Sequence, residues 1–385
     1  MNDRNYGIYL HIPFCLRKCN YCDFCSFSGK SESEMLSYTD ALCREMRSFS
    51  ARMRGRTADT LFIGGGTPTL LPNEAFLMLG ACLRECFDIS PNAEWTAEAN
   101  PATLDAEKAA LLRQIGVNRI SIGMQSAQDG ELEKLGRIHR ASDLTVAVEA
   151  ARAGGFDNIN LDLMFGIPDQ TAESFSVSLD AALALSPTHL SVYSLQIEEG
   201  TPFYRQRNTL SFPDEDCEDA MHTVLLAKMR EAGFVHYEIS NFARSGYECR
   251  HNLRYWQRGD YLGFGIAAHA FLDGVRSYNT ESLDKYLNDP CGVRATESVP
   301  DIREAEYEAI MLGLRTGDGI EEEAFSSEFG HGFYAQYATA LTLFIRAGLA
   351  EWDGMRTRLT EEGMRLSNAI LTELFNSRVA AHLFP

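Results

Sequence analysis

The sequence predicts an α/β protein, in which a barrel-like sheet of about six parallel strands precedes a small C-terminal helical, winged-helix-like domain. Short apolar or β-branched runs alternate with amphipathic helical stretches over about 190 residues, which is typical of parallel strands joined by right-handed crossovers. Polar or glycine-rich residues recur where several of these runs end. An open sheet gathers its ligand residues at one switch point, so this spread favours a barrel.

The elements are expected in strict alternation. Each strand is a short apolar run, and each helix has apolar residues spaced three and four apart, often after a Ser, Asn or Asp cap. Strands are predicted at residues 6–12, 60–63, 94–97, 119–122, 159–164 and 189–195, and helices at 34–54, 73–86, 105–115, 142–153 and 172–185.

The rest of the chain has a different character. A helix is expected at residues 214–232, a strand at 236–240, a loop over 249–256 and a small-residue segment at 263–269. Beyond Pro300 the chain is rich in helices, Asp353-Gly354 marks a hairpin, and a final amphipathic helix follows Thr360. We divide the chain into a barrel (1–235), a barrel extension (236–299) and the C-terminal domain (300–385), which we assign to packing or partner contacts.

Composition limits the classes of function. The chain has 385 residues, and 45% of them are hydrophobic, which indicates a folded globular protein. Its formal net charge of −19 would repel nucleic acid. The N-terminus lacks the pattern of a secretory signal, and nowhere do 18 apolar residues follow one another. We therefore expect a cytoplasmic protein without a membrane span.

The cysteine pattern carries the first chemical signal. Cys15, Cys19 and Cys22 form a C-x3-C-x2-C loop just after the first predicted strand. Three thiolates on a four-iron cluster leave one iron open to a small molecule. Zinc is the alternative, although a structural zinc site would use a second Cys or His pair, and none is evident. Cys25 could close the fourth position, but we expect it to be a bystander.

The motifs together resemble the radical S-adenosylmethionine (SAM) superfamily, and within it the group of oxygen-independent coproporphyrinogen III oxidases and related heme chaperones. The resemblance implies a partial (β/α)6, TIM-like barrel that holds a [4Fe-4S] cluster on Cys15, Cys19 and Cys22, with SAM on the fourth iron. It is carried in matching order by YLHIPFC (9–15), YCDF (21–24), FIGGGTP (62–68), EANP (98–101), RISIGMQS (119–126), GRIH (136–139), NLDLMFGIP (160–168) and HNLRYW (251–256).

The resemblance also assigns residues. The positions that it matches to SAM contacts are Tyr9, Tyr21, Gly65, Gly66, Thr67, Glu98, Gln125, Arg137 and Asp162. Taken one by one, these could equally be a tight turn, caps or a buried ion pair.

The HNLRYW segment is matched to the heme chaperones. Its His251, Asn252, Tyr255 and Trp256 are heme candidates, because imidazole ligates heme iron and aromatic rings pack on porphyrin. The alternative is that Trp256 anchors the core and His251 orients a loop. Cys249 and His269 are weaker candidates for the iron.

Two functions from the porphyrin group compete. The oxidases carry a fourth cysteine where this chain has Phe24, so we expect a heme chaperone that passes heme to respiratory acceptor proteins, without certain catalytic residues and with enzyme activity left open. The alternative is a coproporphyrinogen III oxidase, which needs a low-potential electron donor to cleave SAM to a 5′-deoxyadenosyl radical. A third reading is a non-catalytic iron–sulfur module. The oligomeric state stays open, a homodimer included.

Overall fold

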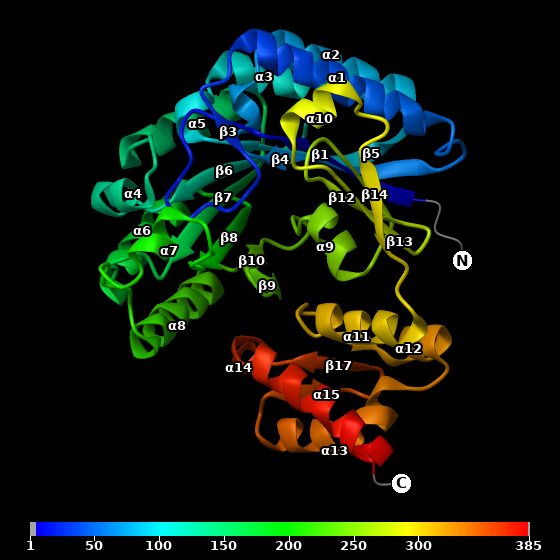
Figure 1. The fold of residues 1–385 in the computed structure, drawn as a ribbon. Coiled ribbons are helices and arrows are strands. Elements are labelled where there is room, and N and C mark those ends of the chain that lie inside the picture. Colours follow the sequence, from blue (N-terminus) through cyan, green and yellow to red (C-terminus); the bar gives the residue numbers. More distant parts are fainter. Residues whose placement is uncertain (1–4, 384–385) are drawn as a thin grey trace. The chain divides into compact units, whose positions relative to one another are not determined.

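A computed structural model describes residues 5–383, and its contacts divide the chain into two compact units (Figure 1). The first unit comprises Met1–Val235, Phe242–His251 and Asp260–Ser298, and the second comprises His236–Asn241, Asn252–Gly259 and Val299–Pro385. The three-part division predicted from the sequence, at residues 235 and 299, stays a proposal about folding units.

A single curved sheet forms the centre of the first unit. Within the first unit, its strands lie in the order β14-β13-β12-β11-β1-β4-β5-β6-β7-β8-β10. Every neighbouring pair from β1 to β8 is parallel, so the predicted partial barrel is confirmed. β11 adds a parallel strand beside β1, and β12 to β14 continue antiparallel. The bounds are β1 Asn5–Ile12, β4 Thr57–Gly65, β5 Asp88–Ala99, β6 Arg119–Gln125, β7 Asn158–Phe165, β8 His189–Ser194, β10 Asn241–Ala243, β11 Tyr261–Phe264, β12 His269–Leu272, β13 Val275–Asn279 and β14 Arg294–Ser298.

Helices cover the outer face of this sheet, where α1 packs on α2, α2 on α3, α3 on α5 and α6 on α8 (Figure 1). The predicted helices are present with shifted ends; α1, for example, starts at a capping box formed by Ser31 and Glu34. In the part of the chain from residue 5 to 383, no helix is both long enough and apolar enough to cross a bilayer. The bounds are α1 Glu32–Ser50, α2 Asn73–Cys86, α3 Ala106–Ile115, α4 Asp129–Leu135, α5 Ala141–Ala153, α6 Ala172–Ala184, α7 Pro202–Gln206, α8 Glu215–Glu231 and α10 Leu283–Asn288.

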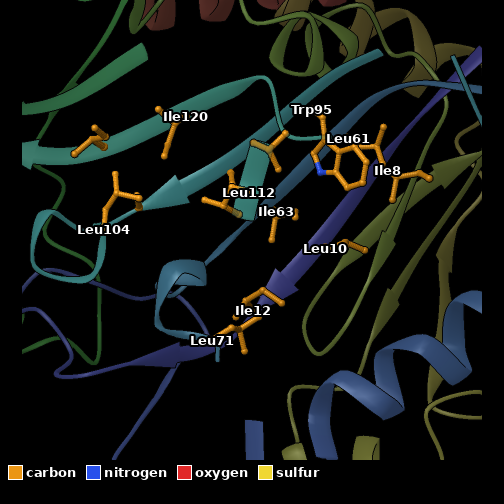
Figure 2. Packing of buried hydrophobic residues seen from close by; sticks show 14 of the residues in the cluster. Ile8, Leu10, Ile12, Leu61, Ile63, Leu71, Trp95, Leu104, Leu112 and Ile120 are labelled. Atoms are coloured by element: carbon orange, nitrogen blue, oxygen red, sulfur yellow. The ribbon is translucent and has the colours of Figure 1, made fainter. Parts of the chain in front are cut away.

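The strands present apolar side chains to the helices and polar side chains to the barrel interior. Successive side chains of a strand point to opposite faces. Ile8, Leu10 and Ile12 of β1 are buried in the hydrophobic cluster with Leu61 and Ile63 of β4 (Figure 2). Each such side chain contributes roughly 1.5–3 kcal/mol to folding. The same alternation turns Tyr9 and His11 toward the interior, so the residues that build the core also place the site.

The segment predicted as a loop over residues 249–256 is instead helical, because α9 spans Arg250–Trp256. The first amide groups of a helix lack partners within it. Here the Glu94 carboxylate on β5 accepts hydrogen bonds from the backbone N–H groups of Arg250 and His251, both at 3.0 Å. This cap lies about 155 residues away in sequence, so local reasoning could not find it.

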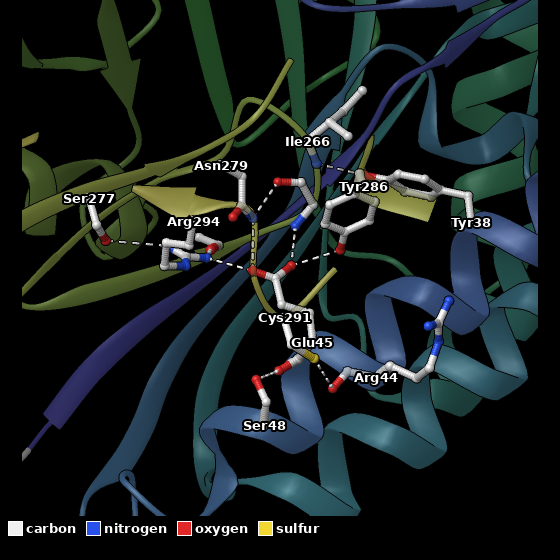
Figure 3. Close-up of polar contacts among 12 residues, drawn as sticks. Tyr38, Arg44, Glu45, Ser48, Ile266, Ser277, Asn279, Tyr286, Cys291 and Arg294 are labelled. Atoms are coloured by element: carbon white, nitrogen blue, oxygen red, sulfur yellow. Dashed lines mark hydrogen bonds and ion pairs between the residues drawn. The ribbon is translucent and has the colours of Figure 1, made fainter. Parts of the chain in front are cut away.

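A buried carboxylate joins α1 to the antiparallel end of the sheet (Figure 3). Glu45 is 1% exposed and accepts hydrogen bonds from the Gly265 backbone at 2.9 Å, Tyr286 at 2.7 Å, and Asn279 and Arg294 at 2.8 Å each. Because all four donors bind the same carboxylate, the position of the antiparallel end of the sheet depends on one side chain of α1.

The second unit has its own core, which packs helices against a small sheet. β16 and β17 form the expected hairpin around Asp353-Gly354, and β15 pairs with β17. The expected final helix is divided, since α14 ends at Arg365 and α15 begins at Ser367. β9 spans Val235–Glu238, and all of it except Val235 belongs to the second unit. The bounds of the other elements are α11 Ile302–Gly313, β15 Ile320–Glu321, α12 Glu322–Phe329, α13 Phe333–Arg346, β16 Ala350–Trp352, β17 Arg356–Leu359, α14 Glu361–Arg365 and α15 Ser367–Leu383.

Replacing Glu45 by Ala should lower the free energy of unfolding by about 3–5 kcal/mol, because it leaves a buried arginine and three further donors without their acceptor. Urea unfolding followed by circular dichroism measures the change. Glu85→Ala is the control, since Glu85 pairs with Arg47 at the surface and its removal should leave the unfolding midpoint unchanged. Equal midpoints for the two variants would contradict the role of Glu45.

Candidate cofactor site at the carboxyl ends of the strands

The cysteine loop leaves the sheet directly after β1 and is fastened to other segments at several points. β2 (Phe14–Cys15) and β3 (Phe27–Ser28) pair as its two ends. Arg17 donates to the Gly136 carbonyl at 2.7 Å, the Asn20 backbone N–H donates to the Leu135 carbonyl at 2.9 Å, and Lys18 donates to the Phe24 carbonyl at 2.9 Å. Strand pairing and hydrogen bonds within the protein therefore hold the conformation of the cysteine loop.

Cys15, Cys19 and Cys22 are half-buried and none is in a disulfide. The Thr67 hydroxyl donates to the Cys15 sulfur at 3.7 Å, and an Arg137 Nη donates to the Cys19 sulfur at 3.7 Å. Burial raises the pKa of the Cys22 thiol to about 11, although a backbone hydrogen bond from Phe24 opposes this. Within residues 5–383, no three His, Cys, Asp or Glu side chains converge on a single metal ion. In a [4Fe-4S] cluster, each cysteine binds a different iron.

The glycine-rich segment lies against the cysteine loop. Gly65 has φ +115°, and a Cβ on it would stand 2.7 Å from the His11 ring. A Cβ on Gly66 would stand 3.0 Å from the Cys15 sulfur and 2.8 Å from the Phe14 carbonyl. Only glycine allows this approach of backbone to a sulfur ligand. The absence of side chains here is thus a requirement of the site.

Glu98 on β5 accepts a hydrogen bond from the Gly65 backbone N–H at 3.0 Å. Burial, reinforced by the nearby Asp162 carboxylate, raises the pKa of Glu98 to about 8. The same burial raises the pKa of Asp162, against hydrogen bonds from Asn160, Ser191 and Ser121. Two buried carboxyl groups in one interior favour a cationic ligand, which would stabilise their charged forms.

Polar residues missed by the sequence analysis surround Asp162. The register pairs Glu98 with Ser121, Ser121 with Asn160, and Asn160 with His189 across β5 to β8. Asn160 donates to Ser121 and to Asp162, both at 2.7 Å, and its carbonyl oxygen lies 2.6 Å from His189 Nδ1. Alternation within each strand was the signal that could have identified this row.

Arg137 and Gln125 lie where β6 ends. Gln125 has φ +65°, an uncommon backbone conformation for a residue with a side chain. Arg137 donates from one Nη to the Gly123 carbonyl at 2.7 Å and from the other to Cys19, and its Nε is buried without a hydrogen-bond partner. The site therefore contains an unused donor on a buried cation.

The predicted tyrosines also reach this region. The Tyr9 hydroxyl lies 3.0 Å from His11 Nδ1, and His11 Nε2 lies 2.8 Å from the Cys25 carbonyl. Burial lowers the pKa of His11, so its ring is neutral and links β1 to the cysteine loop. Tyr21 is close to Arg137, and burial raises the pKa of its hydroxyl. His11 is a further site residue that sequence reasoning did not single out.

His251, the first of the heme candidates, contacts β4 and not the cysteine loop. His251 is 0% exposed, its Nδ1 lies 2.9 Å from the Thr60 hydroxyl, and its ring stacks on Phe62 at 5.4 Å. Thr60 stands near the start of β4, whereas the glycine-rich segment begins with the last two residues of that strand. These contacts are those of the orienting role left open above; they occupy Nδ1, so iron ligation by His251 would use the other ring nitrogen, Nε2.

The remaining candidates have varied surroundings. The Cys249 thiol is buried and donates to Glu94 at 3.5 Å. His269 is exposed and stacks on Tyr278. Trp256 hydrogen-bonds the carboxylate of Glu238 and so opposes the burial that raises the pKa of Glu238 to about 7. Asn252 and Tyr255 are half-buried on α9.

Comparisons with known proteins identify the family of the chain. The sequence model of the Radical SAM superfamily matches residues 9–182, and that of the HemN C-terminal domain matches residues 303–366. The chain is 38% identical to Heme chaperone HemW of Bacillus subtilis over 372 residues, 94% of this chain and 97% of that protein. It is 42% identical to Heme chaperone HemW of Escherichia coli, over 76% and 79% of the two chains.

The chain belongs to the HemW family. The fold has a solved counterpart in coproporphyrinogen III oxidase (HemN) from Escherichia coli, with a TM-score of 0.85 and 23% identity over 97% of this chain and 90% of that one. Membership confirms the resemblance that the motifs indicated, and it implies a [4Fe-4S] cluster and SAM as cofactors of the chain.

The residues present fit both cofactors of a HemW family member. Three thiols with their own hydrogen-bond donors suit a cluster, and the glycine at position 66 leaves room beside Cys15. The unpartnered Arg137 Nε suits a carboxylate, while Glu98 and Asp162 suit the cationic and hydroxyl groups of SAM. The assignment of Tyr9, Tyr21, Gly65, Gly66, Thr67, Glu98, Gln125, Arg137 and Asp162 to SAM stays a prediction.

Replacing Glu98 by Gln should change how stability depends on pH. The folded chain keeps the Glu98 proton up to about pH 8, whereas an unfolded carboxyl releases it near pH 4.5. The cluster-free parent should therefore lose stability relative to Glu98→Gln as pH rises through this window, by about 1.4 kcal/mol per pH unit. Urea unfolding at pH 6, 7 and 8 measures the difference. Parallel pH profiles for parent and variant would contradict the burial of a proton at Glu98.

Proposed function

We propose that the chain is a heme chaperone of the HemW type, which binds heme and passes it to acceptor proteins. The observation that carries the proposal is its 38% identity over nearly the full length of Heme chaperone HemW of Bacillus subtilis. A second relative, Heme chaperone HemW of Haemophilus influenzae, is 39% identical over 96% of this chain. Shared length supports a shared function more strongly than a shared barrel, because one fold hosts many reactions.

The cofactor site has a defined place in this proposal. Cys15, Cys19 and Cys22 would hold the cluster, and SAM would lie between Arg137 on one side and Glu98 and Asp162 on the other. When bound, this pair of cofactors supplies one-electron reductive chemistry. The chain itself fixes the loop through Arg17 and His11 and surrounds the ligands with buried donors and acceptors.

Heme is the cargo of the protein and not a resident cofactor. His251, Asn252, Tyr255 and Trp256 are the proposed heme contacts, with His251 as the proposed iron ligand. Iron would bind Nε2, the ring nitrogen that does not face the Thr60 hydroxyl. The finer parts of the proposal are respiratory acceptor proteins, a low-potential electron donor for the cluster, a homodimer and a cytoplasmic location.

Coproporphyrinogen oxidation is the competing function. The fold of HemN supports it only at the level of architecture, since the identity is 23%. Phe24 is 60% exposed at the position where the oxidases carry their fourth cysteine, and a phenyl ring cannot replace a thiol. We therefore propose that the chain lacks this activity.

Replacing Cys19 by Ala should abolish the cluster, because only two of its four irons would then keep a cysteine ligand. Iron and acid-labile sulfide analysis after anaerobic reconstitution, together with the absorbance near 400 nm, measures the loss. Cys25→Ala is the matched control and should keep the full iron content, as expected of a bystander. Unchanged iron in Cys19→Ala would rule out the site, and loss of iron in Cys25→Ala would make Cys25 a ligand.

Titration of the reconstituted protein with heme, with coproporphyrinogen decarboxylation assayed on the same sample, separates the two functions. We expect stoichiometric heme binding and no decarboxylation with SAM and a reductant. His251→Ala should weaken heme binding by about tenfold, or 1.4 kcal/mol, and shift the Soret band. Thr60→Val keeps the imidazole and should bind heme like the parent. Turnover to the divinyl product would overturn the chaperone proposal.

A further inference from the structure

Two donors from outside the cysteine loop point at the sulfur atoms of the proposed ligands. Arg137 follows α4, and its Nη donates to Cys19; Thr67 follows β4, and its hydroxyl donates to Cys15. Both donor–sulfur distances are 3.7 Å, which is in the range of a hydrogen bond to sulfur. Because the two donors come from different parts of the barrel, the barrel itself supplies hydrogen bonds to the cysteine sulfurs.

Arg137 is held in place by its surroundings. Its second Nη donates to the Gly123 carbonyl, and Arg17 donates at 2.8 Å to the carbonyl of Arg137 itself. The preceding Gly136 has φ +75° and ends α4. The guanidinium thus has a fixed direction, which a flexible surface arginine lacks.

The charge of Arg137 has no carboxylate partner among the residues from 5 to 383. The groups that raise its pKa against burial are Tyr21 and Cys19. A buried cation without a counter-ion costs several kcal/mol, so an anion is expected beside it. The thiolates of an iron–sulfur cluster supply that negative charge, and the carboxylate of SAM can add to it.

Thr67 makes the same kind of contact without a charge. Its backbone N–H donates to the Phe14 carbonyl at 2.8 Å, which sets the segment beside the first cysteine. Its hydroxyl is then the neutral counterpart of the Arg137 contact. A pair of donors that differ in charge allows the two contributions to be separated by experiment.

We infer that Arg137 and Thr67 set the reduction potential of the cluster by donating hydrogen bonds to the sulfur atoms of Cys19 and Cys15. The inference rests on the proposed cluster site. Reduction adds one electron to the cluster, and donors that face its sulfurs stabilise the more negative, reduced form. Removing either donor therefore makes the cluster harder to reduce.

The test is a redox titration of the reconstituted full-length protein, followed by electron paramagnetic resonance. SAM is left out, so that a contact between Arg137 and SAM cannot contribute. Arg137→Gln should lower the equilibrium constant for reduction at least tenfold, which is about 59 mV for one electron. Thr67→Val should lower it by about threefold, and Thr67→Ser, which keeps the hydroxyl, should match the parent.

Arg140→Gln is the control for charge alone. Arg140 lies three residues further on, is exposed and pairs with Asp129, so its removal should leave the potential unchanged. Iron content separates the two levels of the argument: a parent protein that holds no cluster contradicts the proposed site. Fully loaded Arg137→Gln and Thr67→Val with unchanged potentials would overturn the inference, as would an equal shift in Arg140→Gln. If Arg137→Gln does not assemble a cluster, the pair of Thr67 variants decides.

Discussion

The parallel pairing of β1 with β4 is the constraint on which the site depends. It sets Ile12 opposite Gly65, so the two chains leave the sheet side by side. Beyond the last pair, Gly66 and Thr67 still donate their backbone N–H groups to the carbonyls of Ile12 and Phe14, both at 2.8 Å. The cysteine loop and the glycine-rich segment therefore meet as a continuation of the sheet, and a shift of β1 by one residue would turn Tyr9 and His11 to the helical face.

Side chains alternate between the two faces of these strands, so the same strands build both the core and the site. Ile8, Leu10 and Ile12 face the helices, while Tyr9 and His11 face the interior. The interior is lined with polar groups that bind one another or the backbone: Asn160 joins Asp162 and His189, and Glu98 binds the Gly65 N–H. Burial of the apolar side chains on the outer face offsets the free-energy cost of this polar interior.

Much of this could be predicted from the sequence, because its signals are local. Strand order follows from alternation with helices, and the cysteine spacing identifies the loop without any tertiary information. The helix at α9 was missed because Glu94, its cap, belongs to a distant strand. The same is true of the Glu45 cluster and of the contact of Arg137 with Cys19, since each depends on segments that only folding brings together. For His251, the motif identifies a conspicuous residue, but its contacts with Thr60 and Phe62 come from the fold.

The charges of the interior form a pattern that neither the sequence nor the fold explains without a ligand. Arg137 carries a buried positive charge with an unused donor, whereas burial, reinforced by the nearby Asp162, raises the pKa of Glu98 to about 8. A ligand with an ammonium group would release the Glu98 proton, and its carboxylate would satisfy the Arg137 Nε in the same event. An amino acid head group has both charges on one carbon, so it could relieve both costs at once where two separate ions would each lose their own freedom. The methionyl end of SAM carries both of these charges, so under the proposed assignment it is the part of SAM that would relieve both costs.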